Sequence, residues 1–402
     1  MMSKAAGGHR KITAGMLLFY ALVALASLEF GLRAFWLKKL VLGQGIEHPH
    51  FHHRLKPSSL ETFASDEFNV TTTTNSYGLR GKDPVLPKPA GIKRILMLGD
   101  SYTFGFPVKD EETFSALAEK ALQAKGLSVD VVNGGVSGYS PTLHFISLRD
   151  QFLDFQPDAV ILWYDLGDLM EDHWFQKNLL LDAQGNIVRC DPNYINGRFS
   201  MKHWILNHSA IAIYTNNKII RTWEKAKILG PWNYLKMALR GERAKAAIAK
   251  IKREQKAADL AENDKFLLVR PESTPESLEP YWQLSRKYLL MIRDLLRERH
   301  IPLLIGVYPY GMVVAENQWD EGRTAWGFEK GNVYSADAFL TLMRQFCESN
   351  AIPLIDTFGD FKQAATTETL FYRWDGHFTP AGHRIVAQRL AQNPALLQVA
   401  GQ

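Results

Sequence analysis

The sequence predicts an α/β protein with a five-stranded parallel sheet and helices on both faces. Short apolar runs alternate with amphipathic helical segments from about residue 94 onwards. Parallel strands joined by right-handed crossover helices are the usual outcome of this alternation. The expected strands are ILMLG, VDVVN, AVILWY, PLLIGVY and PLID, and the expected helices are ETFSALAEKALQAKG, LHFISLRDQFLDF, YLLMIRDLLRERH, FLTLMRQFCESN and PAGHRIVAQRL.

Composition supports a large folded core and excludes several classes of protein. The chain has 402 residues, of which 46% are hydrophobic, so disordered and collagen-like classes are excluded. A formal net charge of +5 is mild for this length, and nucleic acid is not an expected partner. Cys190 and Cys347 lack CxxC spacing, which supports neither a disulfide framework nor a structural metal site, and whether they pair stays open.

The amino terminus predicts a membrane anchor. Residues 12–28 carry no charge, and the apolar character continues past Glu29, so we expect a short leader at 1–11 and one transmembrane helix at 12–37. A cleaved signal peptide is the alternative, but no clear A-x-A site follows. Basic residues flank both sides of this helix equally, while the short leader favours an N-terminus inside the cell and the rest of the chain outside.

Three further segments complete the expected organisation. Residues 38–67 read as a polar linker, whose His48, His50, His52 and His53 fit a solvated linker better than a metal site. The main domain is expected at 68–402, and its first strand, FNVTTTTNSYGLRG, predicts an added hairpin with a turn at Asn75 to Gly78. A basic helical insertion is expected at about 171–280, where contact with a membrane and plain solvation both remain open.

Candidate catalytic residues follow the first strand and precede the last helix. The run RILMLGDSYTFG places Ser101 just after a buried strand, at the carboxyl edge where open α/β sheets bind ligands. A serine hydroxyl needs a base to become a nucleophile. The run RWDGHFTPAGH supplies His377, with Asp375 two residues before it, and in an extended segment these two side chains face the same way. His383 falls inside the following helix and is expected to pack or cap.

Three blocks together resemble the SGNH or GDSL hydrolase superfamily. GDSY resembles its first block, VVNGGVSGYSP its second and DGHFTPAGH its last. The resemblance implies a three-layer, flavodoxin-like fold, with Ser101 as nucleophile, His377 as general base and Asp375 as its orienter. It also implies that the backbone amides of Ser101 and Gly138 bind the oxyanion. This acyl chemistry requires neither a metal nor an organic cofactor.

The third block departs from the family pattern. It reads WYDLGDLMED, with Gly167 where the family places an oxyanion-binding Asn. An ionised carboxylate cannot donate the missing hydrogen bond. Two interpretations remain for Asp165 and Asp168: they border the pocket and accept bonds from sugar hydroxyls, or they cap the loop and helix. Arg323 and Trp374 are further candidates for a sugar-binding pocket.

An anchor, an added hairpin and these blocks resemble a membrane-tethered bacterial branch related to polysaccharide O-acetyl esterases and acetyltransferases. The leading hypothesis is an extracytoplasmic serine esterase or O-acyltransferase that acts on acyl groups, acetyl above all, of a carbohydrate. By the same resemblance, a multi-spanning membrane acyltransferase is a candidate partner. Two alternatives remain: a lipid esterase or thioesterase, and a non-catalytic scaffold that binds a glycan or a partner. The sequence does not separate hydrolysis from transfer.

Overall fold

The computed structural model describes residues 14–32, 45–212, 214–215 and 266–401. The chain divides into two compact units, one made of Met1–Leu42 with Ser200–Gly241 and the other of the remaining residues. The expected leader, both ends of the expected anchor and most of the basic part of the expected insertion lie outside the described residues.

The smaller unit contains the apolar helix α1 (Ala14–Gly31) and the helix α6 (Met201–His208). Glu29 of α1 accepts hydrogen bonds from the backbone amides of Ala210 and Ile211, at 2.7 and 3.0 Å. Along the stretches of chain that the structure describes, no helix has the length and apolar character needed to cross a membrane.

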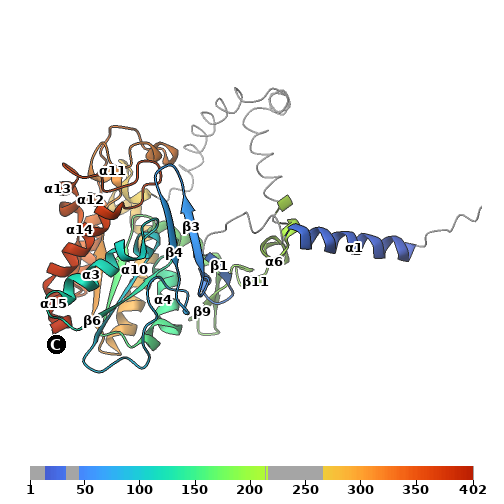
Figure 1. The fold of residues 1–402 in the computed structure, drawn as a ribbon, viewed down its shortest axis with the longest axis horizontal. Helices are drawn as coiled ribbons and strands as arrows, with labels where there is room; N and C mark the ends of the chain where they lie inside the picture. The colour runs from blue at the N-terminus through green and yellow to red at the C-terminus, as the bar shows by residue number, and fades with distance from the viewer. Residues whose placement is uncertain (1–13, 33–44, 213, 216–265, 402) are drawn as a thin grey trace, which may run out of the picture. The chain divides into compact units, whose positions relative to one another are not determined.

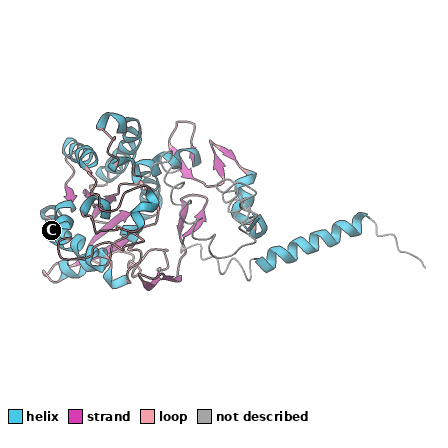
Figure 2. Cartoon of the chain, turned by 90° about the horizontal axis from the view of Figure 1, so that it is seen from above, coloured by secondary structure: helices cyan, strands magenta, loops and turns pink. Residues whose placement is uncertain are grey.

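The larger unit is built on the predicted five-stranded parallel sheet (Figure 1, Figure 2). Its strand order, β13-β12-β7-β5-β6, is that of a flavodoxin-like sheet. Four of these strands are runs of mostly buried residues, as expected where helices cover both faces, and the short edge strand β13 buries only Ile355 fully. The strands are β5 (Lys93–Gly99), β6 (Val129–Gly135), β7 (Ala159–Tyr164), β12 (Leu303–Val307) and β13 (Leu354–Asp356).

Strand order also places the helices. The chain moves from β5 to β6 in one direction and then from β6 past β5 to β7 in the other, so right-handed crossovers put the first two connecting helices on opposite faces. One face of the sheet carries α3 (Phe114–Gln123), and α14 (Pro380–Gln392) packs against α3. The other carries α4 (Pro141–Asp150), α10 (Pro275–Arg297) and α12 (Asp337–Ser349).

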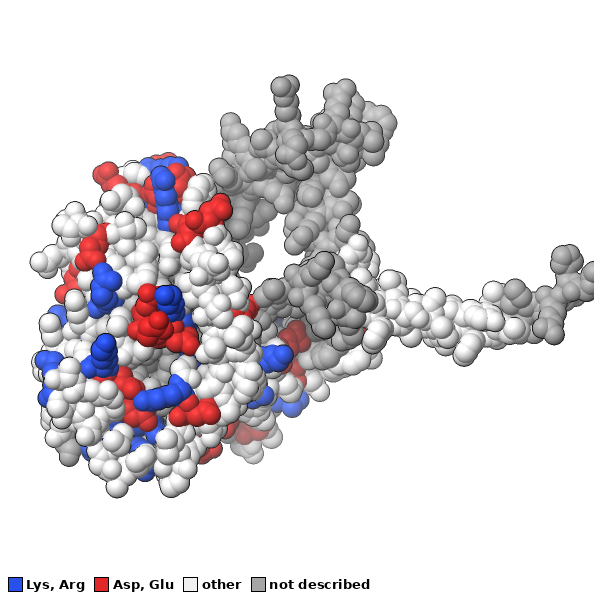
Figure 3. Space-filling model, in the orientation of Figure 1, with Lys and Arg blue, Asp and Glu red and all other residues white. Residues whose placement is uncertain are grey.

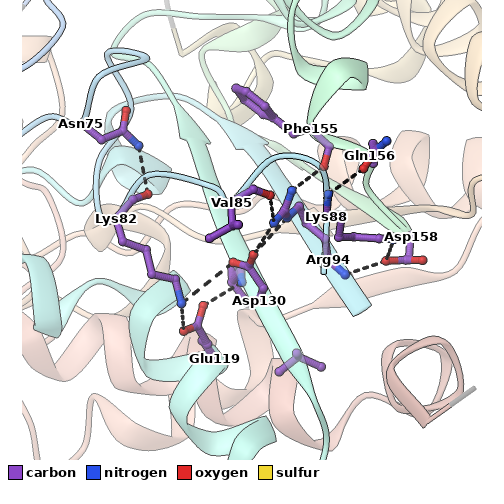
Figure 4. A network of polar contacts seen from close by, with 12 residues as sticks. Asn75, Lys82, Val85, Lys88, Arg94, Glu119, Asp130, Phe155, Gln156 and Asp158 are labelled. Carbon is purple, nitrogen blue, oxygen red and sulfur yellow. Dashed lines mark hydrogen bonds and ion pairs between the residues drawn. The ribbon is translucent and has the colours of Figure 1, made fainter. Parts of the chain in front are cut away.

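A buried arginine anchors the start of β5, at the edge of the sheet opposite the expected site. The Arg94 guanidinium is fully buried, donates to Asp130 on β6 at 2.8 Å and also donates to the Phe155 carbonyl at 2.7 Å (Figure 4). Asp158 accepts from the Arg94 backbone amide and from Lys88. The charge of Arg94 is therefore paired in a low-dielectric position, where an unpaired charge would be costly.

Two hairpins precede the sheet, where a linker was expected over 38–67. The first pairs β1 (Gly45–His48) with β2 (His52–Leu55), and the second pairs β3 (Leu60–Ala64) with β4 (Asn69–Thr73). The linker expectation is therefore wrong from Gly45 onwards, because the polar residues of this segment pair as strands. The predicted turn is confirmed, since the Gly78 amide donates to the Asn75 carbonyl at 3.0 Å.

The insertion starts with the end of α5 (Asp168–Phe175), but it is not helical from Leu179 to Phe199. Residues 176–199 contain two small antiparallel hairpins, because short runs separated by turns cannot sustain a helical period. Cys190 and Cys347 are both buried and are not joined. The remaining elements are α2 (Ser101–Phe104), α5 (Asp168–Phe175), β8 (Leu179–Leu181), β9 (Ile187–Cys190), β10 (Tyr194–Ile195), β11 (Arg198–Phe199), α11 (Gly311–Val314), α13 (Phe358–Ala364) and α15 (Pro394–Gly401).

Acidic and basic side chains are interspersed on the face of the larger unit seen in Figure 3, with uncharged surface between them. This face therefore carries no broad region of a single sign among the residues described.

Candidate active site

Ser101 lies at the sharp turn between β5 and the short helix α2. Asp100 caps that helix, because its carboxylate accepts from the Tyr102 backbone amide at 2.9 Å. Gly99 is required here, since a Cβ on it would lie 2.0 Å from the Thr103 hydroxyl oxygen. The turn thus presents the Ser101 side chain at the carboxyl edge of the sheet, as the sequence predicts.

The structure brings Ser101, His377 and Asp375 together. The Ser101 hydroxyl oxygen lies 2.8 Å from His377 Nε2, and His377 Nδ1 lies 2.6 Å from Asp375 Oδ1. The His377 and Asp375 side chains are 22% and 26% exposed, so the cluster is at the surface and within reach of a substrate. An ionised Asp375 accepts only, so Nδ1 carries a proton and Nε2 is free to accept the serine proton.

A tight turn, and not an extended segment, joins Asp375 to His377. Gly376 has a φ of +93°, a left-handed conformation that favours glycine. The turn lets Asp375 Oδ1 also accept from the His377 backbone amide at 3.1 Å. The expectation of an extended pair is therefore wrong in its geometry, although the two side chains do meet.

Tyr102 ties the nucleophile turn to this turn. Its hydroxyl donates to the Gly376 carbonyl at 2.9 Å, and its ring lies 4.7 Å from the His377 ring. Burial, followed by nearby carboxylates, raises the pKa of Tyr102 well above its usual value, so the hydroxyl stays a donor. The position of the base relative to the nucleophile thus depends on packed side chains and not on one flexible loop.

His377 controls the charge of Asp375. Burial alone would raise the pKa of Asp375, but hydrogen bonds from His377 and its charge outweigh burial and hold the pKa below its usual value. The carboxylate therefore stays ionised through neutral and mildly acidic pH. It can stabilise the imidazolium that forms when His377 takes a proton.

A turn after β6 carries the candidate oxyanion amide. The Tyr139 amide donates to the Val136 carbonyl at 3.0 Å, and Gly138, inside the turn, has a φ of +74°. Because Ser137, the second residue of the turn, does not have a positive φ, these values match a type II turn. Among the described residues, the backbone amides of Ser101 and Gly138 have no recorded acceptor, so both are available to an incoming oxyanion.

Asp165 and Asp168 hold the loop that departs from the family pattern. Asp165 accepts from the Gly167 and Asp168 amides and from the Tyr310 hydroxyl, and Asp168 accepts from the Asp165 amide at 3.0 Å. Both carboxyls are almost fully buried, which leaves capping as their role and removes them as surface acceptors for sugar. Gly167 contributes only backbone to this loop.

The pKa of Asp168 differs from that of an exposed carboxyl. Burial, then the neighbouring carboxylates beginning with Asp165, raise the pKa of Asp168 well above its usual value. A protonated Asp168 does not repel an oxyanion.

Arg323 and Trp374 differ in their positions. Arg323 is fully buried and donates to backbone carbonyls, including Trp319 at 3.1 Å and Ala315 at 3.0 Å. It therefore braces its own loop, and the expectation that it lines an open pocket is wrong. Trp374 is 52% exposed and directly precedes Asp375, so its indole face is open to solvent beside the catalytic cluster.

The sequence did not predict that three further residues support the site. Glu67 accepts from the backbone amides of Trp374 and Asp375, His53 contacts the Ser137 carbonyl, and Arg80 donates to carbonyls at the end of α2. The first two lie in the segment read as a linker, and no local motif marks them. The only signal was Arg80 itself, an arginine in the otherwise small and apolar run GLRG.

A profile of the GDSL-like lipase/acylhydrolase family matches residues 97–385, more than two-thirds of the chain. The chain belongs to this family. It is a serine hydrolase of the GDSL esterase type, and the matched region spans the nucleophile turn, the oxyanion turn and the Asp375–His377 turn.

Solved structures similar to this GDSL hydrolase show low identity. An acetyl xylan esterase is 14% identical over 74% of this chain and 97% of its own, with a TM-score of 0.36. An acetylxylan esterase from Geobacillus stearothermophilus is 14% identical over 77% and 94%, with a TM-score of 0.36. An α/β hydrolase from the metagenome of Lake Arreo, Spain, is 13% identical over 77% and 95%, with a TM-score of 0.33. A comparison with curated proteins gives no match.

Proposed function

We propose that this hydrolase takes an acyl group from an ester through a covalent acyl-Ser101 intermediate. The observation that carries the proposal is the continuous chain of hydrogen bonds from Ser101 through His377 to Asp375. The serine oxygen attacks the ester carbonyl while His377 Nε2 takes the hydroxyl proton, and the amides of Ser101 and Gly138 bind the oxyanion. Collapse of the tetrahedral intermediate breaks the ester bond, and His377 returns the proton to the leaving alcohol.

The proposed acyl group is short, with acetyl as the leading case. Packed aromatic rings support this, because Tyr102 contacts Tyr308 at 5.0 Å, Tyr310 at 5.1 Å and Phe378 at 4.6 Å beside the catalytic histidine. All four rings are buried, so the volume on this side of His377 is filled by side chains. A long acyl chain needs an apolar channel, and rings packed in this way leave no room for one there.

The proposed substrate is an acylated carbohydrate. The open position of the cluster suits an ester carried on a polymer, and the exposed indole of Trp374 offers a flat apolar face next to Asp375. A sugar hydroxyl or water then resolves the acyl-enzyme, which gives transfer in the first case and hydrolysis in the second. Both outcomes use His377 as the base in the second step.

We further propose that the amino-terminal segment anchors the protein in the inner membrane, with the catalytic unit outside the cytoplasm. Supporting this, the described part of α1 exposes large apolar side chains, among them Leu18 at 63% and Phe19 at 62%. Such side chains are stable in lipid or against a partner. A multi-spanning membrane acyltransferase remains the proposed partner, as the source of activated acyl groups for transfer.

Turnover of p-nitrophenyl acetate, butyrate and octanoate by the full-length protein in detergent tests this function. We expect turnover to depend on Ser101, to fall as the acyl chain lengthens and, for a transferase, to accelerate when a deacylated oligosaccharide is added. Preference for octanoate would favour a lipid esterase. An absence of Ser101-dependent turnover of every ester would favour the scaffold. The matched control is Ser76→Ala, which removes an exposed hydroxyl from the Asn75–Gly78 turn.

A further inference from the structure

The first hairpin contacts the turn that carries the candidate oxyanion amide. His53 of β2 lies with Nε2 2.8 Å from the Ser137 carbonyl oxygen. The Tyr139 hydroxyl donates to the His53 carbonyl at 2.6 Å, and the two rings lie edge to face at 5.0 Å. His53 is therefore bonded on both sides of Gly138, to the residue before it and to the residue after it.

Hydrogen-bonding rules settle the direction of the contact with Ser137. A carbonyl oxygen only accepts, so His53 Nε2 carries the proton and donates. In the neutral ring, Nδ1 is then an acceptor. His52 Nδ1, which lies 3.0 Å from His53 Nδ1, is its donor. Burial lowers the pKa of His53, and lowers that of His52 to about 3, so both rings are neutral at physiological pH.

The Ser137 carbonyl and the Gly138 amide belong to the same planar, trans peptide group, so they point in opposite directions. A donor that holds the carbonyl on the hairpin side therefore holds the amide on the opposite side. This peptide is the central one of the turn from Val136 to Tyr139, which turns over by roughly half a rotation between type I and type II turns. Gly138 tolerates both signs of φ, so the residue type alone does not select the orientation.

We infer that His53 is a positioning residue for the oxyanion amide: its hydrogen bond to the Ser137 carbonyl keeps the Gly138 N–H turned toward the reacting centre. The inference rests on the proposed function, in which the Gly138 amide binds the oxyanion. It assigns the hairpin β1–β2, which lies outside the residues matched by the family profile, a part in the reaction. In this role His53 acts through the Ser137–Gly138 peptide and not on the reacting atoms.

The test compares His53→Ala, His53→Gln and His50→Ala in the full-length protein, with p-nitrophenyl acetate as substrate. Without the donor, the peptide populates both orientations. We therefore expect kcat of His53→Ala to fall about tenfold to a hundredfold, below the ~10²–10³-fold cost of deleting an oxyanion donor. The KM and the shape of the pH profile should not change, because His377 and Asp375 are untouched. Glutamine places an N–H at a similar reach and should restore most of the rate.

His50→Ala is the matched control, because it removes the 2.6 Å contact between the same hairpin and Asp150 without touching the turn. A double-mutant cycle with Gly138→Ala separates positioning from general support of the fold. If His53 acts through this peptide, His53→Ala costs little more once Gly138→Ala has already disturbed it. Additive losses would overturn the inference.

Other outcomes are also decisive. Equal kcat values for His53→Ala and His50→Ala, or equal losses for the alanine and glutamine variants, would overturn the role of His53 while leaving the esterase assignment intact. If His53→Ala does not fold, two other measurements decide. One compares the kcat of His53→Gln with that of the wild type, and the other is the double-mutant cycle of His53→Gln with Gly138→Ala. A wild-type protein without Ser101-dependent turnover would remove the proposed function, and this inference with it.

Discussion

The carboxylate of Glu67 accepts a hydrogen bond from the backbone amide of Asp375 at 3.0 Å, and a second from the amide of Trp374. Glu67 lies between β3 and β4, so a residue of the second hairpin holds the turn that carries the general base His377 and its orienting carboxylate Asp375. Each hairpin before the sheet thus supports one side of the site: β1–β2 the oxyanion turn and β3–β4 the Asp375–His377 turn.

Glu67→Ala should weaken catalysis by disturbing this turn. Two backbone amides lose a charged acceptor, and we expect the unfolding free energy to fall by about 2 kcal/mol and kcat by about tenfold. Glu67→Gln keeps an acceptor oxygen and should lie between the alanine variant and wild type. Denaturant unfolding and steady-state kinetics measure both effects. The exposed neighbour Asp66 provides the control, and an equal effect of Asp66→Ala would contradict the role of Glu67.

Arg80→Met should damage both stability and activity. The buried Arg80 guanidinium donates to the Phe104 carbonyl at 3.1 Å and to Asp110 at 2.8 Å, and it also donates to the Gly105 and Val108 carbonyls. Its loss leaves these acceptors unpaired just after the nucleophile helix, so we expect a loss of about 3 kcal/mol and a fall in kcat.

Arg94→Met is the matched control for Arg80. Arg94 is equally buried and paired, but it lies at the start of β5, away from the site. We expect a similar loss of unfolding free energy with kcat preserved at a temperature where the variant is folded. A comparable fall in kcat for both variants would show that general stability, and not the support of α2, sets the rate.

Asp168→Asn should stabilise the protein increasingly as the pH rises. The folded chain keeps the Asp168 carboxyl protonated well above its usual pKa, whereas the unfolded chain loses the proton near pH 3.9. Above about pH 3.9 the folded protein therefore keeps the Asp168 proton that the unfolded chain has lost. The unfolding free energy of the wild type then falls as the pH rises, by up to ~1.4 kcal/mol per pH unit. A neutral amide removes this loss. Unfolding curves from pH 4 to 8 that stay parallel for wild type and variant would contradict the protonated state.

His144→Phe should flatten the acid limb of the stability curve. His144 is fully buried, neither ring nitrogen has a partner among the described residues, and burial lowers its pKa to about 3. In the unfolded chain His144 binds a proton below about pH 6.5, whereas in the folded chain it stays neutral down to about pH 3. The unfolding free energy therefore falls as the pH drops from 6.5 toward 3, by ~1.4 kcal/mol per pH unit. The variant's advantage should grow as the pH falls. Melting temperatures across pH 4 to 7 measure it, with the exposed His173→Phe as control.

Local patterns account for the parts of the molecule that the sequence predicted well. The sheet was predictable because each strand is a short apolar run between turn residues, and β7 (AVILWY) is buried along its whole length. Ser101 and the Asp375–His377 pair were predictable because each lies next to the element that presents it. The sharp turn at Gly376 was not, since the dipeptide spacing alone does not give the sign of φ.

Long-range contacts account for what the sequence did not predict. Glu67 meets Trp374 across a separation of 307 residues, and His53 meets Ser137 across 84. Neither residue belongs to a periodic or motif-like pattern, so only the packed structure brings them to the site. For Asp165, Asp168 and Arg323, a local pattern in the sequence led to a wrong prediction. Charged residues near a strand end suggested an open pocket, whereas each is buried and bonded mainly to nearby loop backbone.

The most direct test of the central claim is the intact mass of the full-length protein, quenched in acid within seconds of mixing with p-nitrophenyl acetate. The account predicts one added acetyl group, mapped to Ser101 by peptide sequencing, absent from Ser101→Ala and formed far more slowly in His377→Ala. Asp375→Asn should slow it at least a hundredfold, because the imidazole then loses its orienting carboxylate. Release of p-nitrophenol at the wild-type rate by Ser101→Ala, or an acetyl group on any other residue, would contradict the account.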